Sequence, residues 1–285
     1  MPGRSLIELY EARYRAVVSA SGEEIKTVLK YGKGSFNSGL SKARLDGDYI
    51  IIGDSIRVPA PDSVDMLRPE MIYYYTEGGG WKPAEDRSRG YARLFARWRG
   101  PPTIELDGIH MHRVKDTDPL RDTLSKIRAA RIRRGMLVLD TCMGLGYTAI
   151  ASYRRGARVV TIEVDDRVLN LVGVNPWSRD LGSHGITVIR GDVTRIIEYF
   201  SDSVFDAVIH DPPRLSSSTG DLYGSRFYSE LFRVLKPGGR LFHYTGEPGR
   251  KRRLNIPGRV ASRLRDTGFS GVRFDRYAQG VVGFK

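Results

Sequence analysis

Five short apolar runs recur along the second part of the chain, and helical or loop stretches separate them. They read MLVLD, ARVVTIEV, GITVIRGD, FDAVIHD and GRLFHYT. Strands that alternate with helices pack as a parallel sheet covered on both faces. Two further runs at the C-terminus, GVRFDRY and GVVGFK, are joined too tightly for a parallel crossover and should form an antiparallel hairpin. The sequence therefore predicts an α/β fold with a doubly wound, mostly parallel, seven-stranded sheet that ends in an antiparallel hairpin.

The first hundred residues lack this alternation. The segment LIELYEARYRAVV predicts a helix that leads into a strand, and ARLDGDYIIIGDSIRVP predicts a hairpin that turns at Asp46-Gly47 or at Gly53-Asp54. Gly100-Pro101-Pro102 is a natural boundary, because glycine and proline interrupt regular structure. We therefore expect a small α+β module at residues 1–100 and the α/β domain at residues 101–285.

The segment just after this boundary should also be structured. TIELDGIHMHRV predicts two short strands about an Asp-Gly turn. DPLRDTLSKIRAARI predicts a helix that begins at Asp118-Pro119, with its apolar positions at Leu120, Leu124, Ile127 and Ile132. Near the C-terminus, GRVASRLRDTGF predicts another helix.

Composition narrows the class of protein. No apolar run approaches the roughly 18 residues that span a bilayer, and the first residues lack the apolar stretch of a secretory signal, so we expect a cytoplasmic protein without membrane association. One cysteine excludes a disulfide within the chain and a multi-cysteine metal cage, and the histidines lack metal spacing, so no metal is expected. One glutamine and four asparagines beside abundant charge hint at a thermophilic source.

The net charge is +13, from 46 basic and 33 acidic residues. Such an excess suits an anionic partner, with nucleic acid the first candidate. A solvated basic surface without a partner explains the same number, so charge alone does not decide between the two.

A glycine-rich turn follows the first strand of the α/β domain. After Asp140, the residues Gly144, Gly146 and Ala149 fit the pattern G-x-G-x-x-A, which opens a helix at a nucleotide-binding turn. Glu163 ends the second strand, where a carboxylate can accept hydrogen bonds from both hydroxyls of a ribose, and Asp192 ends the third, where it can meet an adenine edge. Each acid alone could instead cap a helix. Acids on successive strands favour a ligand crevice at the carboxyl edge of the sheet.

The distance between the strand and the first glycine separates two ligands. In dinucleotide sites the strand leads almost directly into the glycine, whereas here Asp140-Thr-Cys-Met intervenes. An acid beside the loop would repel pyrophosphate and attract the α-ammonium of a methionyl group. With VLDTCMGLGYTA, TIEVD, RGDV, HDPPR, LKPGGRLFHY and the final hairpin, residues 104–285 resemble the class I S-adenosylmethionine-dependent methyltransferases.

The resemblance implies S-adenosylmethionine as the cofactor. The positions that match its binding motifs are Asp140, Met143, Gly144, Gly146, Glu163, Val164, Asp192 and Val193. One departure is Cys142, where many members carry glycine; we interpret it as a small buried residue.

The run HDPPR at residues 210–214 predicts the catalytic residues Asp211, Pro212 and Pro213. Two prolines fix φ and push the preceding residue toward extended geometry, so Asp211 should be held rigidly at the end of its strand. The run resembles the fourth motif of methyltransferases that act on planar amines. There the Asp211 carboxylate and a backbone carbonyl, that of Pro212, would accept the two N–H bonds of a base amine and turn its lone pair toward the methyl group.

Arg214 departs from the aromatic residue that usually follows this motif. A guanidinium can stack on a base or bind a phosphate, but Arg214 could instead pair with a local acid. The missing aromatic platform could come from Tyr223, Phe227, Tyr228 or Trp177. Methylation at carbon 5 of a pyrimidine would need a cysteine nucleophile, and Cys142 lies far in sequence from HDPPR, which argues against that chemistry.

Two basic clusters could bind RNA phosphates or simply be solvated. One is formed by Arg250, Lys251, Arg252 and Arg253, and the other by Arg93, Arg97, Trp98 and Arg99.

As a whole, residues 104–285 resemble most closely an archaeal subgroup of predicted RNA methyltransferases, which implies methylation of a cytidine N4 amine in ribosomal RNA. Four alternatives stay open: an N-methyltransferase of a small molecule or protein, a tRNA base methyltransferase, an aminopropyltransferase, and a non-catalytic RNA-binding protein. The first would not need the basic clusters.

Overall fold

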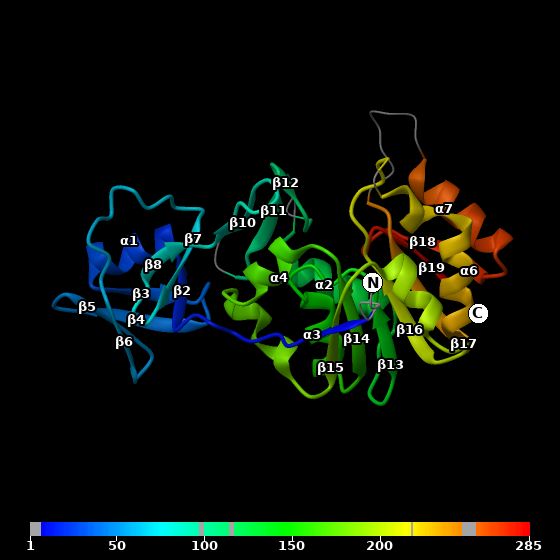
Figure 1. The fold of residues 1–285 in the computed structure, drawn as a ribbon, viewed down its shortest axis with the longest axis horizontal. Helices are drawn as coiled ribbons and strands as arrows, with labels where there is room; N and C mark the ends of the chain where they lie inside the picture. The colour runs from blue at the N-terminus through cyan, green and yellow to red at the C-terminus, as the bar shows by residue number, and fades with distance from the viewer. Residues whose placement is uncertain (1–6, 97–99, 114–116, 218, 247–254) are drawn as a thin grey trace, which may run out of the picture. The chain divides into compact units, whose positions relative to one another are not determined.

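The computed structural model describes residues 7–96, 100–113, 117–217, 219–246 and 255–285. The chain forms two compact units (Figure 1). The first, called here the sheet unit, contains Met1–Glu11, Arg121–Val164 and Ser183–Lys285. The second, called here the accessory unit, contains Ala12–Leu120 and Asp165–Gly182. This grouping differs from the boundary expected at residue 100.

One mixed sheet organises the sheet unit, with the strand order β1-β15-β14-β13-β16-β17-β19-β18. Its strands are β1 (Glu8–Tyr10), β13 (Leu137–Asp140), β14 (Arg158–Glu163), β15 (Ile186–Arg190), β16 (Phe205–His210), β17 (Leu235–Tyr244), β18 (Ser270–Asp275) and β19 (Gly280–Phe284).

Pairing in this sheet follows the alternation of the sequence. The neighbours from β15 to β17 are parallel, while β19 is antiparallel to both β17 and β18. The predicted C-terminal hairpin is therefore confirmed. The sheet has eight strands rather than the expected seven, because β1 adds an antiparallel edge beside β15.

The predicted helix over LIELYEARYRAVV is wrong. Glu8–Tyr10 form β1, and the first helix among the described residues begins only at Gly22. The reason is tertiary: β1 gains a ladder with β15, and Glu8 lies 3.2 Å from Arg190 on that partner strand. Such long-range pairing overrides a weak local helix propensity.

Helices cover the sheet and close its core. They are α2 (Pro119–Ala129), α3 (Tyr147–Arg154), α5 (Val193–Ile196), α6 (Ser225–Val234) and α7 (Ile256–Asp266), with short 3-10 turns at Ile197–Tyr199 (η2) and Gly220–Tyr223 (η3). Leu139, Val208 and Leu241 of the central strands share one buried cluster with Leu231 of α6 and Leu264 of α7. The expected helices at Pro119 and in the segment GRVASRLRDTGF are confirmed.

The accessory unit contains three small antiparallel sheets. Their strand orders are β3-β4-β5-β6, β2-β7-β8 and β12-β11-β10-β9. The strands are β2 (Val18–Ser21), β3 (Lys33–Phe36), β4 (Ser41–Asp46), β5 (Tyr49–Ile52), β6 (Ile56–Pro59), β7 (Ile72–Thr76), β8 (Gly80–Pro83), β9 (Glu85–Asp86), β10 (Ala92–Phe95), β11 (Thr103–Leu106) and β12 (Ile109–His110). Both candidate hairpin turns are used, since β4, β5 and β6 turn at Gly47 and at Gly53.

Helix α1 (Gly22–Tyr31) begins at a capping box between Ser21 and Glu24. Helix α4 (Asp166–Val172) and the 3-10 turn η1 (Pro176–Gly182) follow β14 in sequence but pack within the accessory unit. Arg167 of α4 lies 3.0 Å from Asp107, and Asn170 donates a hydrogen bond to Asp86. None of the described helices is both long and apolar enough to cross a membrane.

Candidate functional site

Four acidic residues stand where neighbouring strands of the sheet unit end. Asp140 ends β13, Glu163 ends β14, Asp192 follows β15 and Asp211 follows β16. These strands are parallel neighbours, so their carboxyl ends meet at one edge of the sheet. That edge is where open α/β sheets bind ligands.

The turn after β13 has the backbone geometry that glycine permits. Gly144 and Gly146 have φ values of 54° and 77°, in the left-handed region. Nothing lies within 4 Å of the place where a Cβ on Gly144 would be, so the turn borders open space. Met143 is buried beneath it and donates its backbone N–H to Ile162 O at 2.8 Å.

Glu163 holds this turn from the neighbouring strand. Its carboxylate accepts hydrogen bonds from the backbone N–H groups of Gly144 and Val164, both at 2.9 Å. The Val164 side chain is 65% exposed, which places an apolar surface beside a partly exposed carboxylate. A sugar that bears hydroxyls, attached to a flat base, is a ligand that these two groups could hold together.

Asp192 acts as the N-cap of α5. Its Oδ1 accepts hydrogen bonds from Thr194 N and Thr194 Oγ1, at 2.9 and 2.8 Å. The capping alternative therefore applies to this acid, although its side chain is 47% exposed and can still meet a ligand. The next residue, Val193, is buried.

Asp140 is fully buried. Thr148 Oγ1 donates to its carboxylate at 3.1 Å and Thr161 Oγ1 at 2.8 Å, so Asp140 ties α3 to β14 beneath the glycine turn. Burial raises the pKa of Asp140 to about 8, against the opposing effect of the two threonine hydroxyls. The expected contact of Asp140 with a methionyl ammonium stays a prediction.

Asp211 is held by a buried lysine. Lys126 Nζ donates to Asp211 Oδ2 at 2.6 Å and lies 2.7 Å from Asp122 Oδ2. The side chains of Lys126 and Asp122 are 4% and 1% exposed, whereas that of Asp211 is 21% exposed. No described residue donates to Asp211 Oδ1, so this oxygen is the one available to a substrate.

Burial and the neighbouring charges have opposite effects on the pKa values of Asp211 and Lys126. Burial raises the pKa of Asp211, and Lys126 counteracts the increase. Burial alone would lower the pKa of Lys126, but Asp211 and Asp122 raise it above its ordinary value. Lys126 therefore stays an ammonium and favours the ionised form of Asp211.

Sequence reasoning missed both Lys126 and Asp122. They lie one helical turn apart on α2 and are buried, as is Ile127 of the same helix. Leu120 and Leu124, two of the apolar positions from which this helix was predicted, are 39% and 40% exposed. The one signal in the sequence was an acid and a base, Asp122 and Lys126, four positions apart on a predicted helix. Such a pair usually lies on a solvated surface, so its spacing did not indicate burial.

Two histidines, His210 and His243, support the end of β16 where the HDPPR segment begins. His210 Nε2 donates to Leu222 O at 2.9 Å, so His210 Nδ1 accepts from Thr141 Oγ1 at 2.7 Å. His243 Nδ1 donates to Tyr244 O, and its Nε2 accepts from Tyr228 OH, both at 2.9 Å. Both rings are fully buried, and each therefore carries a single proton.

The aromatic residues expected to form a stacking platform are packed inside. Tyr223 is 3% exposed and donates its hydroxyl to Pro213 O at 2.8 Å, while Phe227 and Tyr228 are 4% and 0% exposed. They support the HDPPR segment from beneath, an arrangement unlike an open platform. Trp177 belongs to the accessory unit, where its indole N–H donates to Ser38 O at 3.3 Å.

Arg214 is exposed, and its guanidinium makes no ion pair with any described residue. The alternative pairing with a local acid is thus not seen among those residues. Arg93 of β10 is already paired, at 3.2 Å from Glu105 and 3.8 Å from Glu70. The remaining members of the two predicted clusters lie outside the described residues; they are Arg97, Trp98 and Arg99 of one cluster and Arg250, Lys251, Arg252 and Arg253 of the other.

Cys142 lies in the glycine turn, and burial raises the pKa of its thiol well above the ordinary value. At neutral pH it is a thiol, which is a weak nucleophile.

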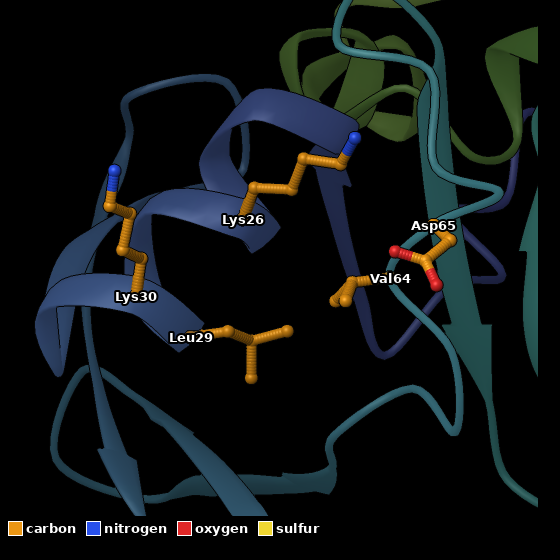
Figure 2. A pocket seen from close by; sticks show the side chains of 5 residues that line it. All are labelled: Lys26, Leu29, Lys30, Val64 and Asp65. Atoms are coloured by element: carbon orange, nitrogen blue, oxygen red, sulfur yellow. The ribbon is translucent and has the colours of Figure 1, made fainter.

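A separate hollow of about 400 Å³ lies in the accessory unit (Figure 2). Lys26, Leu29 and Lys30 of α1 line one side, and Val64 and Asp65 line the other. Figure 2 shows the ammonium groups of the two lysines apart from each other toward the top of the view, with the Leu29 and Val64 side chains below them. It contains none of the predicted site residues.

Comparison with known proteins identifies the family of the chain. Residues 139–243 match the family described as methyltransferase domain. The chain is 51% identical over 215 residues to the uncharacterized protein MJ1233 of Methanocaldococcus jannaschii, covering 75% of this chain and 73% of that protein. It therefore shares a family with that protein, and the matched domain together with the strand order gives the class. The chain belongs to the class I S-adenosylmethionine-dependent methyltransferases.

More distant matches define the fold of this methyltransferase. It is 26% identical over 125 residues to ribosomal RNA large subunit methyltransferase I of Aeromonas hydrophila, which covers 41% of this chain but only 32% of that protein. Spermidine synthase from Thermotoga maritima superposes with a TM-score of 0.56 at 17% identity, over 70% of each chain. This likeness shows a common fold.

S-adenosylmethionine is the cofactor of this class, and the carboxyl edge of the sheet fits it. The open space beside Gly144 leaves room for a ligand against the backbone. Glu163 and Asp192 supply carboxylate oxygens for hydroxyl and amine donors, and Val164 supplies an exposed apolar surface.

Proposed function

We propose that this methyltransferase acts on the exocyclic amine of an RNA base, and that cytidine N4 of ribosomal RNA is the target. The observation that carries the proposal is Asp211, fixed between the end of β16 and two prolines, with one oxygen held by Lys126 and the other available. A planar amine needs such a fixed acceptor, because its lone pair is delocalised into the ring.

We assign the cofactor to the edge formed by β13, β14 and β15. Glu163 would accept hydrogen bonds from the ribose hydroxyls, Val164 would pack on the adenine, and Asp192 would meet the adenine amine. Gly144 and Gly146 would let the backbone approach the cofactor closely, with Met143 and Val193 packed beneath and Asp140 toward the methionyl group. When bound, S-adenosylmethionine supplies a methyl group on a positively charged sulfur.

We assign the substrate amine to Asp211 and its neighbours. Asp211 Oδ1 would accept one N–H bond and the Pro212 carbonyl the other, which directs the nitrogen lone pair away from the ring plane. The same carboxylate oxygen can take the proton that leaves the amine as the new bond forms. Pro213 would contribute rigidity only. Its carbonyl already accepts a hydrogen bond from Tyr223 OH, so we do not assign it as an acceptor for the amine.

RNA is supported as the substrate by two observations. The net charge of +13 suits a polyanion, and relatives of this chain include proteins named as ribosomal RNA and tRNA methyltransferases. The basic residues Arg250–Arg253, and Arg214, which forms no ion pair with a described residue, are our candidates for phosphate and base contacts. A tRNA base, or a small molecule or protein amine, is the alternative target.

Aminopropyl transfer is a second candidate, because relatives of this chain include a protein named polyamine aminopropyltransferase 2. A polyamine substrate is a cation and needs carboxylates without a counterion. Here Asp211 and Asp122 already share the Lys126 ammonium, so neither carboxylate of this group is without a counterion. This pairing favours a neutral amine as the substrate.

A single-turnover assay tests the proposal. Labelled cofactor is mixed with total RNA, and the nucleosides are identified after nuclease digestion. Asp211→Ala should lower the rate by about 10²–10⁴ while cofactor affinity is retained. Asp211→Asn should keep partial activity, because it retains an acceptor oxygen and many relatives of this motif carry asparagine.

Full activity of Asp211→Ala would contradict the assignment, as would a product methylated on a ribose hydroxyl or a ring carbon. Aminopropyl transfer from the decarboxylated cofactor to putrescine, with no transfer to RNA, would establish the second candidate instead.

A further inference from the structure

Four cations and one aromatic ring share the solvent face of a small sheet in the accessory unit. The register of β3, β4, β5 and β6 aligns Lys33 with Arg44, Arg44 with Ile51, and Ile51 with Arg57. Side chains alternate along a strand, so Lys42 and Tyr49 lie on this same face. We call it the outer face; its residues are Lys33, Ser35, Lys42, Arg44, Asp46, Tyr49, Ile51, Arg57 and Pro59.

The opposite face of the same sheet is an apolar core. Phe36, Ala43, Ile50, Ile52 and Val58 are buried there in one cluster with Ile25 and Val28 of α1. Figure 1 shows α1 beside these strands. The alternation therefore separates a packed face from a charged one.

The outer face is open and strongly basic. Lys33, Lys42, Arg44 and Arg57 are all exposed, and only Asp46 opposes them, at 3.9 Å from Arg44. The Arg57 guanidinium lies 3.9 Å from the centroid of the Tyr49 ring, and Tyr49 is 40% exposed. A flat stacked pair thus stands among three further cations.

We propose that the outer face binds single-stranded RNA and holds the substrate RNA of the proposed methyltransferase reaction. Cations that lie on neighbouring strands can contact successive phosphates, and exposed aromatic rings or guanidinium planes on a sheet are surfaces on which unpaired bases stack. The charge complements a polyanion, and the aromatic ring distinguishes this surface from a merely solubilising one. The proposal deepens the proposed function and rests on it.

Two variants with equal loss of charge test the proposal. The first replaces Lys33, Lys42, Arg44 and Arg57 by serine. The control replaces four exposed arginines of the sheet unit, Arg128, Arg133, Arg155 and Arg276, by serine. Binding of the full chain to a labelled oligouridine is measured over a range of salt concentrations, and thermal unfolding and S-adenosylmethionine calorimetry confirm that each variant is folded.

We expect the outer-face variant to bind at least tenfold more weakly and its logarithmic salt slope to fall by about 2–3, from roughly 0.7 for each phosphate that the variant no longer binds. The control should change less than twofold. Tyr49→Ala should weaken binding about tenfold without changing the salt slope, because stacking releases no counterions.

The outcomes separate this proposal from the proposed function. If the wild type binds no RNA, the RNA substrate itself is wrong. If it binds RNA and the outer-face variant behaves like the control, only the outer face is wrong. Tighter binding to duplex RNA, or binding to phosphatidylserine vesicles that depends on these residues in place of RNA binding, would also overturn the proposal.

Discussion

At the scale of single residues, the ammonium group of Lys126 decides what Asp211 can do. It binds Oδ2, while no described residue donates to Oδ1, so the orientation of the carboxylate and its ionisation depend on the same contact. Among the described residues, the titratable groups that face Asp211 include Lys126 and Asp122 of α2 and Asp140 of β13, and the pKa values of Tyr223 and Cys142 are raised in part by its charge. Lys126 is the only cation among them.

Lys126→Met should therefore slow methyl transfer about 10- to 100-fold, the effect of removing one charge-assisted hydrogen bond of about 1.5–3 kcal/mol. The pKa of Asp211 is already raised by burial and would rise further without the ammonium. The acidic limb of the pH–rate profile should thus move to higher pH. Lys126→Arg should restore part of the rate and return the limb toward wild type. An unshifted limb in a folded Lys126→Met variant would show that Lys126 is only structural.

Glu163→Ala should reduce affinity for S-adenosylmethionine well over tenfold, because it removes two charge-assisted bonds to the ribose of about 1.5–3 kcal/mol each. Glu163→Gln should lie between, since it keeps an oxygen for the backbone N–H of Gly144. Asp266→Ala, which removes an exposed acid from α7, is the matched control. Calorimetry measures the affinities, and wild-type binding by a folded Glu163→Ala would remove Glu163 from the cofactor site.

At the scale of elements, β16 and β17 place two neutral histidines directly opposite each other. His210 pairs with His243 in the parallel register, and their ring centroids are 4.4 Å apart. Burial lowers the pKa of His210 to about 4 and that of His243 well below its ordinary value, where His210 adds to the effect. These rings hold the strand end from which Asp211 projects, so protonation of either one would disturb the site.

The histidine pair should make the fold sensitive to acid. Below about pH 6.5 the histidines bind protons in the unfolded chain but not in the folded one. Their contribution to the free energy of unfolding is therefore complete above about pH 6.5. It falls as the pH decreases toward about 4, by up to about 1.4 kcal/mol per pH unit for each histidine. Asp140, with its pKa raised to about 8, has the opposite sign.

Only a comparison with a variant therefore isolates the histidines. Denaturant unfolding of wild type and His210→Gln between pH 4 and 7 should show a shallower decline in the variant. Parallel curves would mean that His210 does not carry the acid sensitivity.

At the scale of the whole molecule, the positive excess is divided among surfaces whose roles can be separated. The outer face of the accessory unit carries part of it, and the sequence run Arg250–Arg253, which lies outside the described residues, carries another part. RNA affinity and cofactor affinity should then respond to different substitutions, because the acids assigned to the cofactor are on other elements.

RNA binding should depend less steeply on salt when four residues are neutralised together: Arg250, Lys251, Arg252 and Arg253. The logarithmic salt slope should fall by about 0.7–0.9 for each phosphate that these side chains bind in the wild type. Calorimetric affinity for S-adenosylmethionine should stay at the wild-type value. An unchanged salt slope would show these residues to be a solvated surface.

Much of the sheet unit could be predicted from the sequence. Alternating apolar runs determine a parallel sheet, G-x-G-x-x-A determines a left-handed turn before a helix, and acids at strand ends must meet at one edge. These are local patterns, because each is defined by a hydrophobic period or by turn residues within a few positions of the sequence. They were sufficient to predict that four acids lie at the same edge of the sheet: Asp140, Glu163, Asp192 and Asp211.

Only the tertiary structure decided the rest, because the deciding partners are far apart in sequence. Lys126 reaches Asp211 across 85 positions, and Glu8–Tyr10 become a strand only because β15 offers an edge. The aromatic residues after HDPPR are buried rather than open, since the apolar surface removed from water by packing beneath the strand end outweighs any local preference. No local pattern encodes such pairings, because their stabilisation exists only after the chain has folded.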